Sequence, residues 1–445
     1  MKRICLICIT ILLGVASATL SQPAEHVVLI TIDGFRSDFY LDESWGMVNL
    51  RQMKERGIYA EGVNPVFPSS TFPNHTTIMT GVRSAEHGIY YNNQFASDGT
   101  GEWFWYANSI QAPTLWDAVS EAGLKSVSVN WPVSVDAPID YNIPIIKEPG
   151  ISRLQAIKKH SKPEGLFEEI EQYATGKMGN LDFSMQEDYL LLDQNLARIT
   201  AYLIKKYKPA LTTVRLSLTD NFQHEQGRDG DKVRRVVAGA DRSIKTILDG
   251  IERAGILDET AVIVTGDHGF VNRHTLLAPN VWLKRAGLIE DAKNSDWKAQ
   301  FHTAGGSAFL QLKNPDDLEY LKKVKVVIND LPKGQRKLFR IVEGCELDRL
   351  TIDPAVPLAL TAEQGVGFSS SRSGSTVRPA SGGTHGYLPE FPEIQTGFVG
   401  YGAGFKQDVI IPVMDLEDVA PIITRLLGIK LKSADGAAFP GIFAN

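Results

Sequence analysis

The stretch His26-Val27-Val28-Leu29-Ile30-Thr31-Ile32-Asp33-Gly34 decides the fold class of this chain. Its first seven residues are mostly apolar and β-branched and stop at an aspartate and a glycine, which is the pattern of a strand buried on both faces that ends in a loop. A second such run, residues 261–265, stops at Gly266-Asp267-His268-Gly269. We therefore predict a parallel sheet whose strands deliver polar residues to one edge.

Further strands and helices alternate along the chain. Strand patterns cover residues 125–131, 210–218 and 396–401, and helix patterns cover residues 112–123, 231–254 and 415–427. The 231–254 segment has apolar residues at the spacing of an amphipathic helix. This alternation predicts an α/β fold with a mostly parallel sheet sandwiched by helices.

Two regions interrupt the alternation. Residues 138–192 are mixed and partly helical, and we expect them to form a small excursion. Residues 274–383 carry a helix pattern at 315–324, strand patterns at 308–312 and 338–342, and a Ser/Gly-rich segment, 365–383, most of which we expect to be a flexible loop. We predict that residues 274–383 are an inserted smaller cap and that residues 24–273 and 384–445 form the catalytic core.

Composition excludes one class of partner. The 445 residues are 43% hydrophobic and 22% charged, which is ordinary for a globular protein, and the net charge is -6. A chain without a basic stripe is a poor ligand for long nucleic acids, so we expect a small-molecule partner and no polymeric nucleic acid. Nothing in the sequence indicates the oligomeric state.

The first residues predict export. Met1-Lys2-Arg3 is followed by an apolar run, residues 4–15, and by the small residues Ala16-Ser17-Ala18, which together are typical of a signal peptide over residues 1–18. The run is shorter than the roughly 20 residues that span a bilayer, and we expect no other transmembrane segment. The mature chain would keep only Cys345, and an exported protein without disulfides is more typical of bacteria, either periplasmic or secreted.

Residues 67–88 carry the strongest candidate for a nucleophile. The segment reads F-P-S-S-T-F-P-N-H-T-T-I-M-T-G-V-R-S-A-E-H-G and places Thr71 where a helix could begin. Free N–H groups and the helix dipole favour an anion at such a position, so we predict that Thr71 is the nucleophile. The alternative is that Thr71 only caps the helix.

Aspartates and histidines at distant positions predict metal ligands. Asp33, Asp220 and Asp267 stand at the ends of predicted strands, and two of them have a histidine nearby. Asp220 and His224 are four residues apart, where both could face one ion on a helical turn. Together with the adjacent His268 and with His385 in a turn, these oxygen and nitrogen donors suit Zn²⁺. Two such ions would explain how an otherwise unactivated threonine reacts.

In these motifs the chain resembles the nucleotide pyrophosphatase/phosphodiesterase family of the alkaline phosphatase superfamily. The resemblance rests on seven phrases that occur in the family's order: Asp33-Gly34, Thr71-Phe72-Pro73-Asn74-His75, His87-Gly88-Ile89 with Asn92, Asn130-Trp131-Pro132, Asp220 with His224, Gly266-Asp267-His268-Gly269, and Thr384-His385-Gly386. It covers nearly the whole mature chain. Three positions depart from the family pattern, namely Ser70 in place of lysine, Val133 in place of glycine and Gly266 in place of serine.

The resemblance implies two zinc ions and a phosphate site. One zinc would be held by Asp33, Asp267, His268 and the Thr71 hydroxyl, and the other by Asp220, His224 and His385. Asn92 and the backbone N–H of Phe72 would hold phosphate oxygens. We expect His75 and His87 to orient loops or ligands without binding metal, and Phe72 or the aromatic run 103–106 to stack on a flat group or to pack in the core.

The leading hypothesis is therefore a zinc-dependent hydrolase of phosphodiester or pyrophosphate bonds in nucleotides or other small diesters, with a phosphothreonine intermediate. A phosphomonoesterase on the same metals is the nearest alternative, although a dianion normally needs an Arg or Lys clamp and only Arg83 stands in the opening segment. A non-catalytic exported binding module is the second alternative. The sequence leaves the natural substrate and the metal present in vivo open.

Overall fold

Strand β1 (His26–Ile32) is the strand around which the fold is arranged. The computed structural model describes residues 24–179, 183, 189–291, 296–432 and 434–444, and it places β1 in the interior of a nine-stranded sheet. All seven side chains of β1 are buried, as the apolar run predicts. The predicted signal segment, residues 1–18, lies outside the described residues.

The strands of this sheet follow the order β19-β2-β18-β6-β1-β5-β3-β4, and β20 also pairs with β2. Their bounds are β2 (Ile58–Asn64), β3 (Ser126–Val129), β4 (Tyr141–Ile143), β5 (Leu211–Leu216), β6 (Thr260–Gly266), β18 (Thr396–Gly402), β19 (Val409–Ile411) and β20 (Met414–Asp415). Strands β6, β1, β5, β3 and β4 are parallel, whereas β18 is antiparallel to both β6 and β2. The predicted α/β class with a mostly parallel sheet is confirmed.

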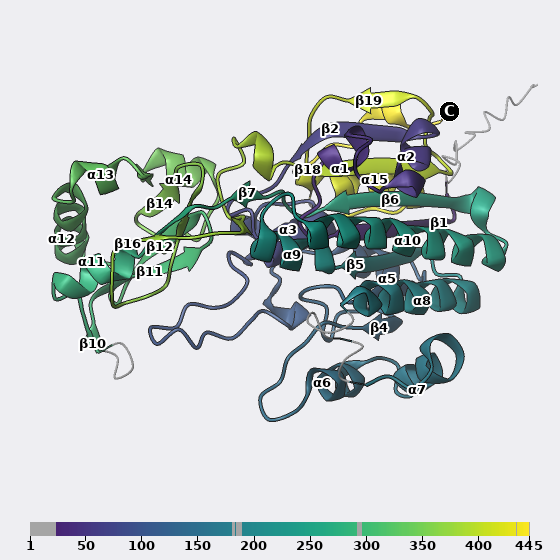
Figure 1. Cartoon of the computed structure of the whole chain (residues 1–445). Helices are drawn as coiled ribbons and strands as arrows, with labels where there is room; N and C mark the ends of the chain where they lie inside the picture. Colours follow the sequence, from purple (N-terminus) through teal and green to yellow (C-terminus); the bar gives the residue numbers. More distant parts are fainter. Residues whose placement is uncertain (1–23, 180–182, 184–188, 292–295, 433, 445) are drawn as a thin grey trace, which may run out of the picture.

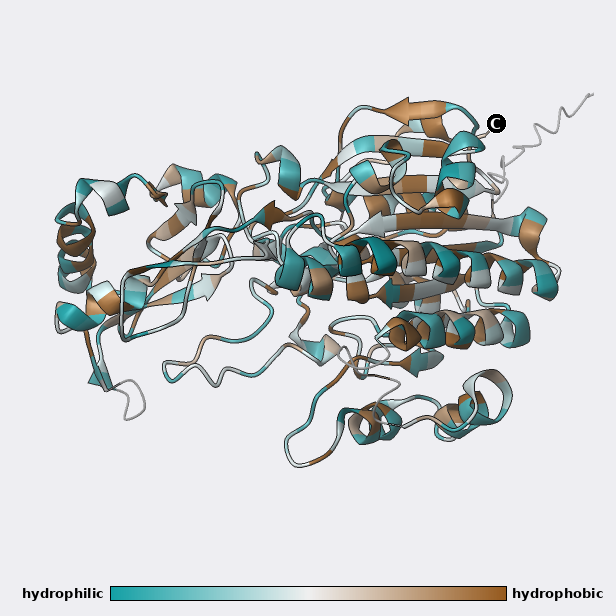
Figure 2. Ribbon diagram, in the orientation of Figure 1, coloured by the Kyte–Doolittle hydropathy of each residue, from teal (hydrophilic) through white to brown (hydrophobic). Residues whose placement is uncertain are grey.

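Helices cover both faces of the sheet. Alternate residues of β1 point to opposite faces, so both faces carry apolar side chains that pack against helices. Val28 and Ile30 pack with α2 (Val48–Glu55), α8 (Leu190–Tyr207) and α10 (Asp231–Ala254). Val27 and Leu29 pack with α3 (Thr71–Thr80), α5 (Leu115–Glu121) and α15 (Val419–Leu427). The outward side of α10 is hydrophilic and the strands behind it are hydrophobic (Figure 2). The other α-helices described outside residues 274–383 are α1 (Asp38–Leu41), α4 (Ser84–His87), α6 (Arg153–His160), α7 (Leu166–Ile170) and α9 (Leu218–Gln226).

Most predicted elements match the structure closely. The 231–254 helix has the predicted bounds, and the strands predicted at 125–131 and 261–265 differ from β3 and β6 by one or two residues at either end. One difference concerns the site, because β5 ends at Leu216 and α9 begins at Leu218. Asp220 therefore lies in the first turn of a helix and not at the end of a strand.

A smaller lobe, which we call the outer lobe, is formed by residues of the 274–383 region and stands to the left in Figure 1. It holds a four-stranded antiparallel sheet, β11-β12-β14-β13, and a three-stranded sheet, β15-β8-β16, over a hydrophobic cluster of its own. The elements of this region and its borders are β7 (Val271–Asn272), β8 (Thr275–Leu277), α11 (Pro279–Arg285), β9 (Ile289–Asp291), β10 (Asp296–Trp297), β11 (Ala299–Ala304), β12 (Ser307–Leu312), α12 (Leu318–Asn329), α13 (Lys333–Arg336), β13 (Phe339–Val342), α14 (Cys345–Arg349), β14 (Ala359–Ala362), β15 (Val366–Phe368), β16 (Val377–Pro379) and β17 (Gly383–Thr384). The predicted division of the chain after residues 273 and 383 stays a prediction.

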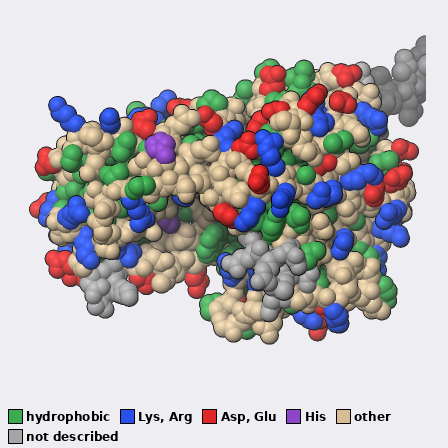
Figure 3. Space-filling model, viewed as in Figure 1, with side chains coloured by type: hydrophobic (Ala, Val, Ile, Leu, Met, Phe, Trp, Pro, Cys, Tyr) green, Lys and Arg blue, Asp and Glu red, His purple; other side chains and the backbone are tan. Residues whose placement is uncertain are grey.

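The Ser/Gly-rich segment 365–383 is more ordered than the sequence suggests. Its strands β15 and β16 flank β8, and β17 pairs with β7. The expectation of a loop was wrong for the residues in these strands, because backbone pairing does not depend on apolar side chains. The rest of the segment lies outside strands and helices. A notch separates the two lobes on the face shown in Figure 3. Among the described residues no helix is both long enough and apolar enough to cross a membrane.

Candidate metal centre

Helix α3 presents Thr71 at its first position. Ser70, the N-cap residue, has an extended backbone, so the helical conformation begins at Thr71, and all ten residues of α3 are buried. The N–H of Phe72 donates to Asn92 Oδ1 at 2.9 Å. Because that oxygen accepts a hydrogen bond, the amide nitrogen of Asn92 is the group left to donate. The N–H of Phe72, which was predicted to hold a phosphate oxygen, therefore donates to Asn92 in this structure, beside the predicted nucleophile.

The first group of predicted ligands gathers Asp33, Asp267 and His268. Asp33 follows β1 and Asp267 follows β6, and these neighbouring parallel strands pair residue for residue up to Ile32 and Gly266. The Nε2 atom of His268 lies 3.6 Å from Asp33 Oδ1 and 3.3 Å from Asp267 Oδ2. All three side chains are fully buried, and one ligand atom from each lies within 4.8 Å of the others.

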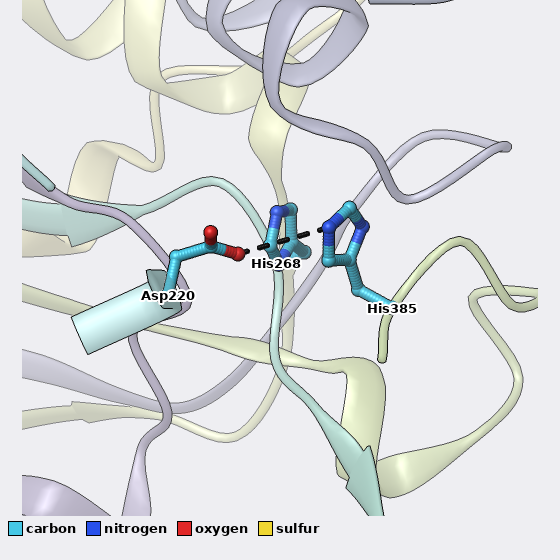
Figure 4. A group of neighbouring side chains, drawn as sticks. All are labelled: Asp220, His268 and His385. Carbon is cyan, nitrogen blue, oxygen red and sulfur yellow. Dashed lines mark ion pairs between the residues drawn. The ribbon is translucent and has the colours of Figure 1, made fainter. Parts of the chain in front are cut away.

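The second group gathers Asp220, His224 and His385. Asp220 and His224 lie one turn apart on α9, with Asp220 Oδ1 3.4 Å from His224 Nε2. His385 follows β17 and brings its Nε2 atom to 3.7 Å from the same oxygen (Figure 4). The rings of His385 and His268 stack with centroids 3.8 Å apart, so the two groups are adjacent. Figure 4 also shows His268 between the two other labelled residues.

The protonation of the three histidines makes these groups fit a cation. In each ring Nδ1 lies close to a backbone carbonyl: Gly269 for His268, Gly383 for His224 and Ser69 for His385, at 3.1, 3.2 and 2.8 Å. A carbonyl oxygen only accepts, so Nδ1 carries the proton in each ring. Burial lowers the pKa of His268 and of His385, so these two rings are neutral and Nε2 keeps a lone pair, whereas at His224 burial is outweighed by the attraction of Asp220, which raises the pKa. Those lone pairs face carboxylate oxygens, which is repulsive unless a positive ion lies between them.

Several of these acceptor atoms are also buried without a partner. Asp33 Oδ1, Asp220 Oδ1, Asp267 Oδ2 and His268 Nε2 accept no hydrogen bond from any described residue. Leaving a buried polar atom unpaired costs about 1–3 kcal/mol, and more when it is charged. Four such atoms converging at one place are the arrangement that a metal ion would satisfy, so the residues present fit the metals that the sequence predicted.

Arg215 is a functional residue that the sequence reasoning missed. It lies on β5 beside β1, and its Nε and Nη2 atoms both donate to Asp33 Oδ2, the former at 3.0 Å. This leaves Asp33 Oδ1 for an ion. Burial raises the pKa of Asp33, but the attraction of Arg215 and His268 outweighs it, so the net pKa is lowered. An arginine within a strand whose other residues are uncharged is the signal that could have revealed the pair, because a buried charge needs a partner.

The pKa of Asp267 is shifted in the opposite direction to that of Asp33. Burial raises the pKa of Asp267, and repulsion from Asp33 raises it further. Its Oδ1 atom accepts a hydrogen bond from Gly34 N at 3.0 Å, which fixes the carboxylate in place. A bound dication would remove the repulsion between the two carboxylates, since it would attract both.

His75 and His87 lie beside the centre without facing it as ligands. The Nδ1 atom of His75 is 2.9 Å from Thr71 O and 3.5 Å from Asp267 Oδ2, so this ring links the nucleophile helix to a predicted ligand. His87 Nε2 is 3.1 Å from Thr77 Oγ1, and its Nδ1 accepts from Ile89 N. Both positions agree with the orienting roles predicted from the sequence.

An aromatic surface adjoins Thr71. Phe72 contacts the rings of Trp103 and Trp105 edge-on, at centroid distances of 5.1 and 5.6 Å, and the two tryptophans stack on each other. Phe72 is buried, whereas Trp103 is 43% exposed. One ring of the cluster thus packs in the core and another is exposed, while stacking on a flat group stays a prediction.

Comparison with known proteins agrees with this geometry. A family model described as type I phosphodiesterase/nucleotide pyrophosphatase matches residues 27–388. The chain is 23% identical over 441 residues to venom phosphodiesterase of Naja atra, covering 93% of this chain and 46% of that protein. It is 24% identical over 428 residues to ectonucleotide pyrophosphatase/phosphodiesterase family member 1 of Homo sapiens, covering 90% and 40%. The chain spans less than half the length of these relatives.

Solved structures of similar fold cover nearly the whole of both chains. Human ectonucleotide pyrophosphatase/phosphodiesterase 5 superposes with a TM-score of 0.67 at 18% identity, over 93% of this chain and 97% of that one. An inactive threonine-to-alanine variant of the murine protein, in complex with AMP, gives 0.67 at 19% identity over 93% and 97%. At this level of identity the likeness shows the fold.

Proposed function

Because the chain belongs to the type I phosphodiesterase/nucleotide pyrophosphatase family of the alkaline phosphatase superfamily, we propose that it is a two-zinc hydrolase of phosphodiester or pyrophosphate bonds. The proposed substrates are nucleotide-like or other small diesters, and the proposed nucleophile is Thr71. The observation that carries the proposal is the set of buried acceptor atoms without partners among the described residues, on Asp33, Asp220, Asp267 and His268, beside the start of α3.

The residues that would hold the metals fall into two sets. Asp33, Asp267, His268 and the Thr71 hydroxyl would hold one zinc, and Asp220, His224 and His385 the other; His268 lies close to both sets. Zinc would supply Lewis acidity, which favours the deprotonated form of a nearby hydroxyl and offsets negative charge on the phosphate.

The chain's own groups account for the two chemical steps. Thr71 Oγ1 loses its proton and attacks phosphorus, and the new O–P bond gives a phosphothreonine. The bond to the leaving oxygen breaks, and that oxygen takes up a proton. Water then attacks the phosphothreonine, releases the phosphate product and restores the hydroxyl. The amide nitrogen of Asn92 would donate to a phosphate oxygen, and the start of α3 would favour the negative charge that gathers there.

Two observations bear on the substrate. The exposed face of Trp103, next to Phe72, would suit a flat group such as a nucleobase, and the murine relative of similar fold is solved with AMP. The buried Arg215 is already paired with Asp33, so its charge is partly offset and it is a weak clamp for a monoester dianion. The first observation favours a nucleotide-like group, and the second favours a diester over a monoester.

The relatives also support a location outside the cytoplasm. They include venom phosphodiesterases and ectonucleotide pyrophosphatases, and we propose export of this chain, to the periplasm or the medium of a bacterium.

Zinc-loaded protein tests the proposal directly. It should hold about two zinc ions per chain and hydrolyse bis-p-nitrophenyl phosphate faster than p-nitrophenyl phosphate. Thr71→Ala should abolish turnover, while Thr71→Ser, which keeps a hydroxyl, should retain part of it. Faster turnover of the monoester would instead indicate a phosphomonoesterase, and less than about one zinc per chain would indicate a binding module.

A further inference from the structure

Gln223 is a buried residue of α9 that the proposed chemistry does not use. It stands between Asp220 and His224, two of the three residues proposed to hold the second zinc. Its side chain is fully buried. A buried amide needs hydrogen-bond partners, and the partners of this one lie on a different segment of the metal centre.

Both ends of the Gln223 amide contact the loop that follows β1. Nε2 donates to Gly34 O at 2.8 Å, and Oε1 accepts from Arg36 Nη1 at 2.8 Å. Because a guanidinium only donates and a carbonyl only accepts, these two partners allow a single orientation of the amide. Gln223 therefore joins α9 to residues 34–36 through two directed hydrogen bonds.

The same loop also fixes the first group of proposed ligands. Gly34 directly follows Asp33, and its N–H donates to Asp267 Oδ1 at 3.0 Å. Gly34 has a φ of 69°, and a Cβ on it would lie 2.7 Å from Phe270 and 2.9 Å from Gln223 Nε2, so a larger residue does not fit. The N–H of Gly34 thus holds a ligand of the first zinc, and its carbonyl holds the helix that carries ligands of the second.

Other contacts hold α9 at its beginning. The Thr219 hydroxyl donates to Asp33 O, and the Asp193 carboxylate accepts from the two N–H groups at the start of the helix. Both contacts precede Asp220 in the chain. The Gln223 amide ties the next turn of α9 to the loop after β1.

Such a tie controls the spacing of the two metal sites. Two metal ions act together on one phosphate when they lie roughly 4 Å apart. A helix that carries two ligands therefore has to keep its place relative to Asp33 if both ions are to reach the same phosphate. Hydrogen bonds that orient metal ligands from outside the coordination shell are typically worth about 10–100-fold in metal affinity or activity.

We infer that Gln223 is a positioning residue, which fixes α9 against the loop after β1 and thereby sets the spacing of the two metal sites. The inference rests on the proposed function, because it takes both sites to be occupied by zinc. Without the amide, α9 keeps the contacts at its beginning, but the turn that carries His224 is held less firmly. The second zinc should then bind more weakly.

Zinc binding is tested first, without reference to turnover. Gln223→Met keeps the length of the side chain and lacks the amide. When the metal-free protein is titrated with zinc against a competing chelator, wild type should bind two ions, and Gln223→Met should bind one of them about tenfold or more weakly. In a His385→Ala background, which lacks a ligand of the second zinc, Gln223→Met should leave the affinity for the remaining ion within threefold.

Asn280→Leu is the matched control. Asn280 lies in the outer lobe and is 1% exposed, and its amide donates to Phe301 O at 2.9 Å and accepts from Phe301 N at 2.7 Å. Its loss removes two buried hydrogen bonds, as the loss of the Gln223 amide does. Asn280→Leu should therefore lower Tm by an amount similar to Gln223→Met and leave both zinc affinities within twofold.

Turnover of bis-p-nitrophenyl phosphate at saturating zinc is tested second. Gln223→Met should lower kcat about tenfold and leave KM within threefold, because both ions are then bound but are no longer held at the spacing that the transition state needs. A purely structural role would leave both constants of the folded protein unchanged, which is the result expected for Asn280→Leu.

Gln223→Leu, which lacks the amide in a shorter side chain, is the second variant and should give the same results. The inference is overturned if Gln223→Met binds both ions as tightly as wild type, if Asn280→Leu weakens zinc binding equally, or if neither Gln223 variant folds. Wild-type protein that binds two zinc ions but turns over no diester would overturn the proposed activity alone, and the titration would still decide the role of Gln223. Wild-type protein with less than about one zinc per chain would overturn both.

Discussion

Replacing Arg215 with Gln should destabilise the metal-free protein far more than the zinc-loaded protein. Arg215 is buried, and its Nε atom lies 3.0 Å from Asp33 Oδ2. At an effective dielectric constant of 20, two charges at that distance attract by about 5 kcal/mol, and removing one partner of a buried pair typically costs about 3–5 kcal/mol. Without a metal, the variant would leave three neighbouring carboxylates, Asp33, Asp220 and Asp267, with no neutralising cation from β5.

The expected size of the effect in a thermal unfolding experiment follows from the length of the chain. An unfolding entropy of about 2.1 cal/mol/K per residue gives about 0.9 kcal/mol/K for 445 residues. A loss of about 3–5 kcal/mol therefore lowers Tm by roughly 3–5 °C in EDTA. With zinc the loss should be less than half of this, because the variant then also loses the repulsion between the guanidinium and the dication.

Differential scanning calorimetry in EDTA and in excess zinc measures both changes in Tm. Arg83→Gln is the matched control, because it breaks an ion pair of 2.6 Å with Glu417, which is none of the predicted ligands, and its Tm change should be the same in both conditions. Arg215→Lys keeps the charge and should recover part of the metal-free stability. An equal loss for Arg215→Gln with and without zinc would refute the idea that Arg215 and the metal act on the same carboxylate.

Three further predictions concern other parts of the site. Gly266→Ala should lower the free energy of unfolding in urea by about 1–3 kcal/mol, because a Cβ there would overlap Phe35; unchanged stability would contradict this. Burial lowers the pKa of His87 to about 3, below the unfolded value of about 6.5. The contribution of the neutral His87 ring to stability is therefore fully present above pH 6.5 and is lost as the pH falls toward 3. In that pH window the free energy of unfolding in urea should fall more steeply for wild type than for His87→Asn, by up to about 1.4 kcal/mol per pH unit. Parallel plots of this free energy against pH for the two proteins would count against the prediction. Trp103→Ala should raise KM for bis-p-nitrophenyl phosphate roughly two- to twelvefold, the worth of one aromatic contact, and an unchanged KM would show that Trp103 does not touch the substrate.

Local patterns in the amino-acid sequence were enough to predict the fold class and the set of candidate ligands. Buried parallel strands give continuous apolar runs, and their carboxyl ends must meet at one edge of the sheet. That is why Asp33 and Asp267 could be placed together from the sequence alone. The pairing of Asp220 with His224 followed in the same way from the four-residue period of a helix, which needs only local geometry.

The meeting of distant segments became evident only in the folded chain. Arg215 reaches Asp33 because the register of β5 against β1 places Arg215 opposite Thr31, on the same face of the sheet as Asp33. The antiparallel direction of β18 depends on its pairing with β2 and with β6. A hydrogen bond from Gln300 Nε2 to Ser97 O joins β11 to a loop that lies 203 residues earlier in the chain. Such contacts arise from long-range packing and register, which local periodicity does not encode, because it records only which face of an element is apolar and not what that face will meet.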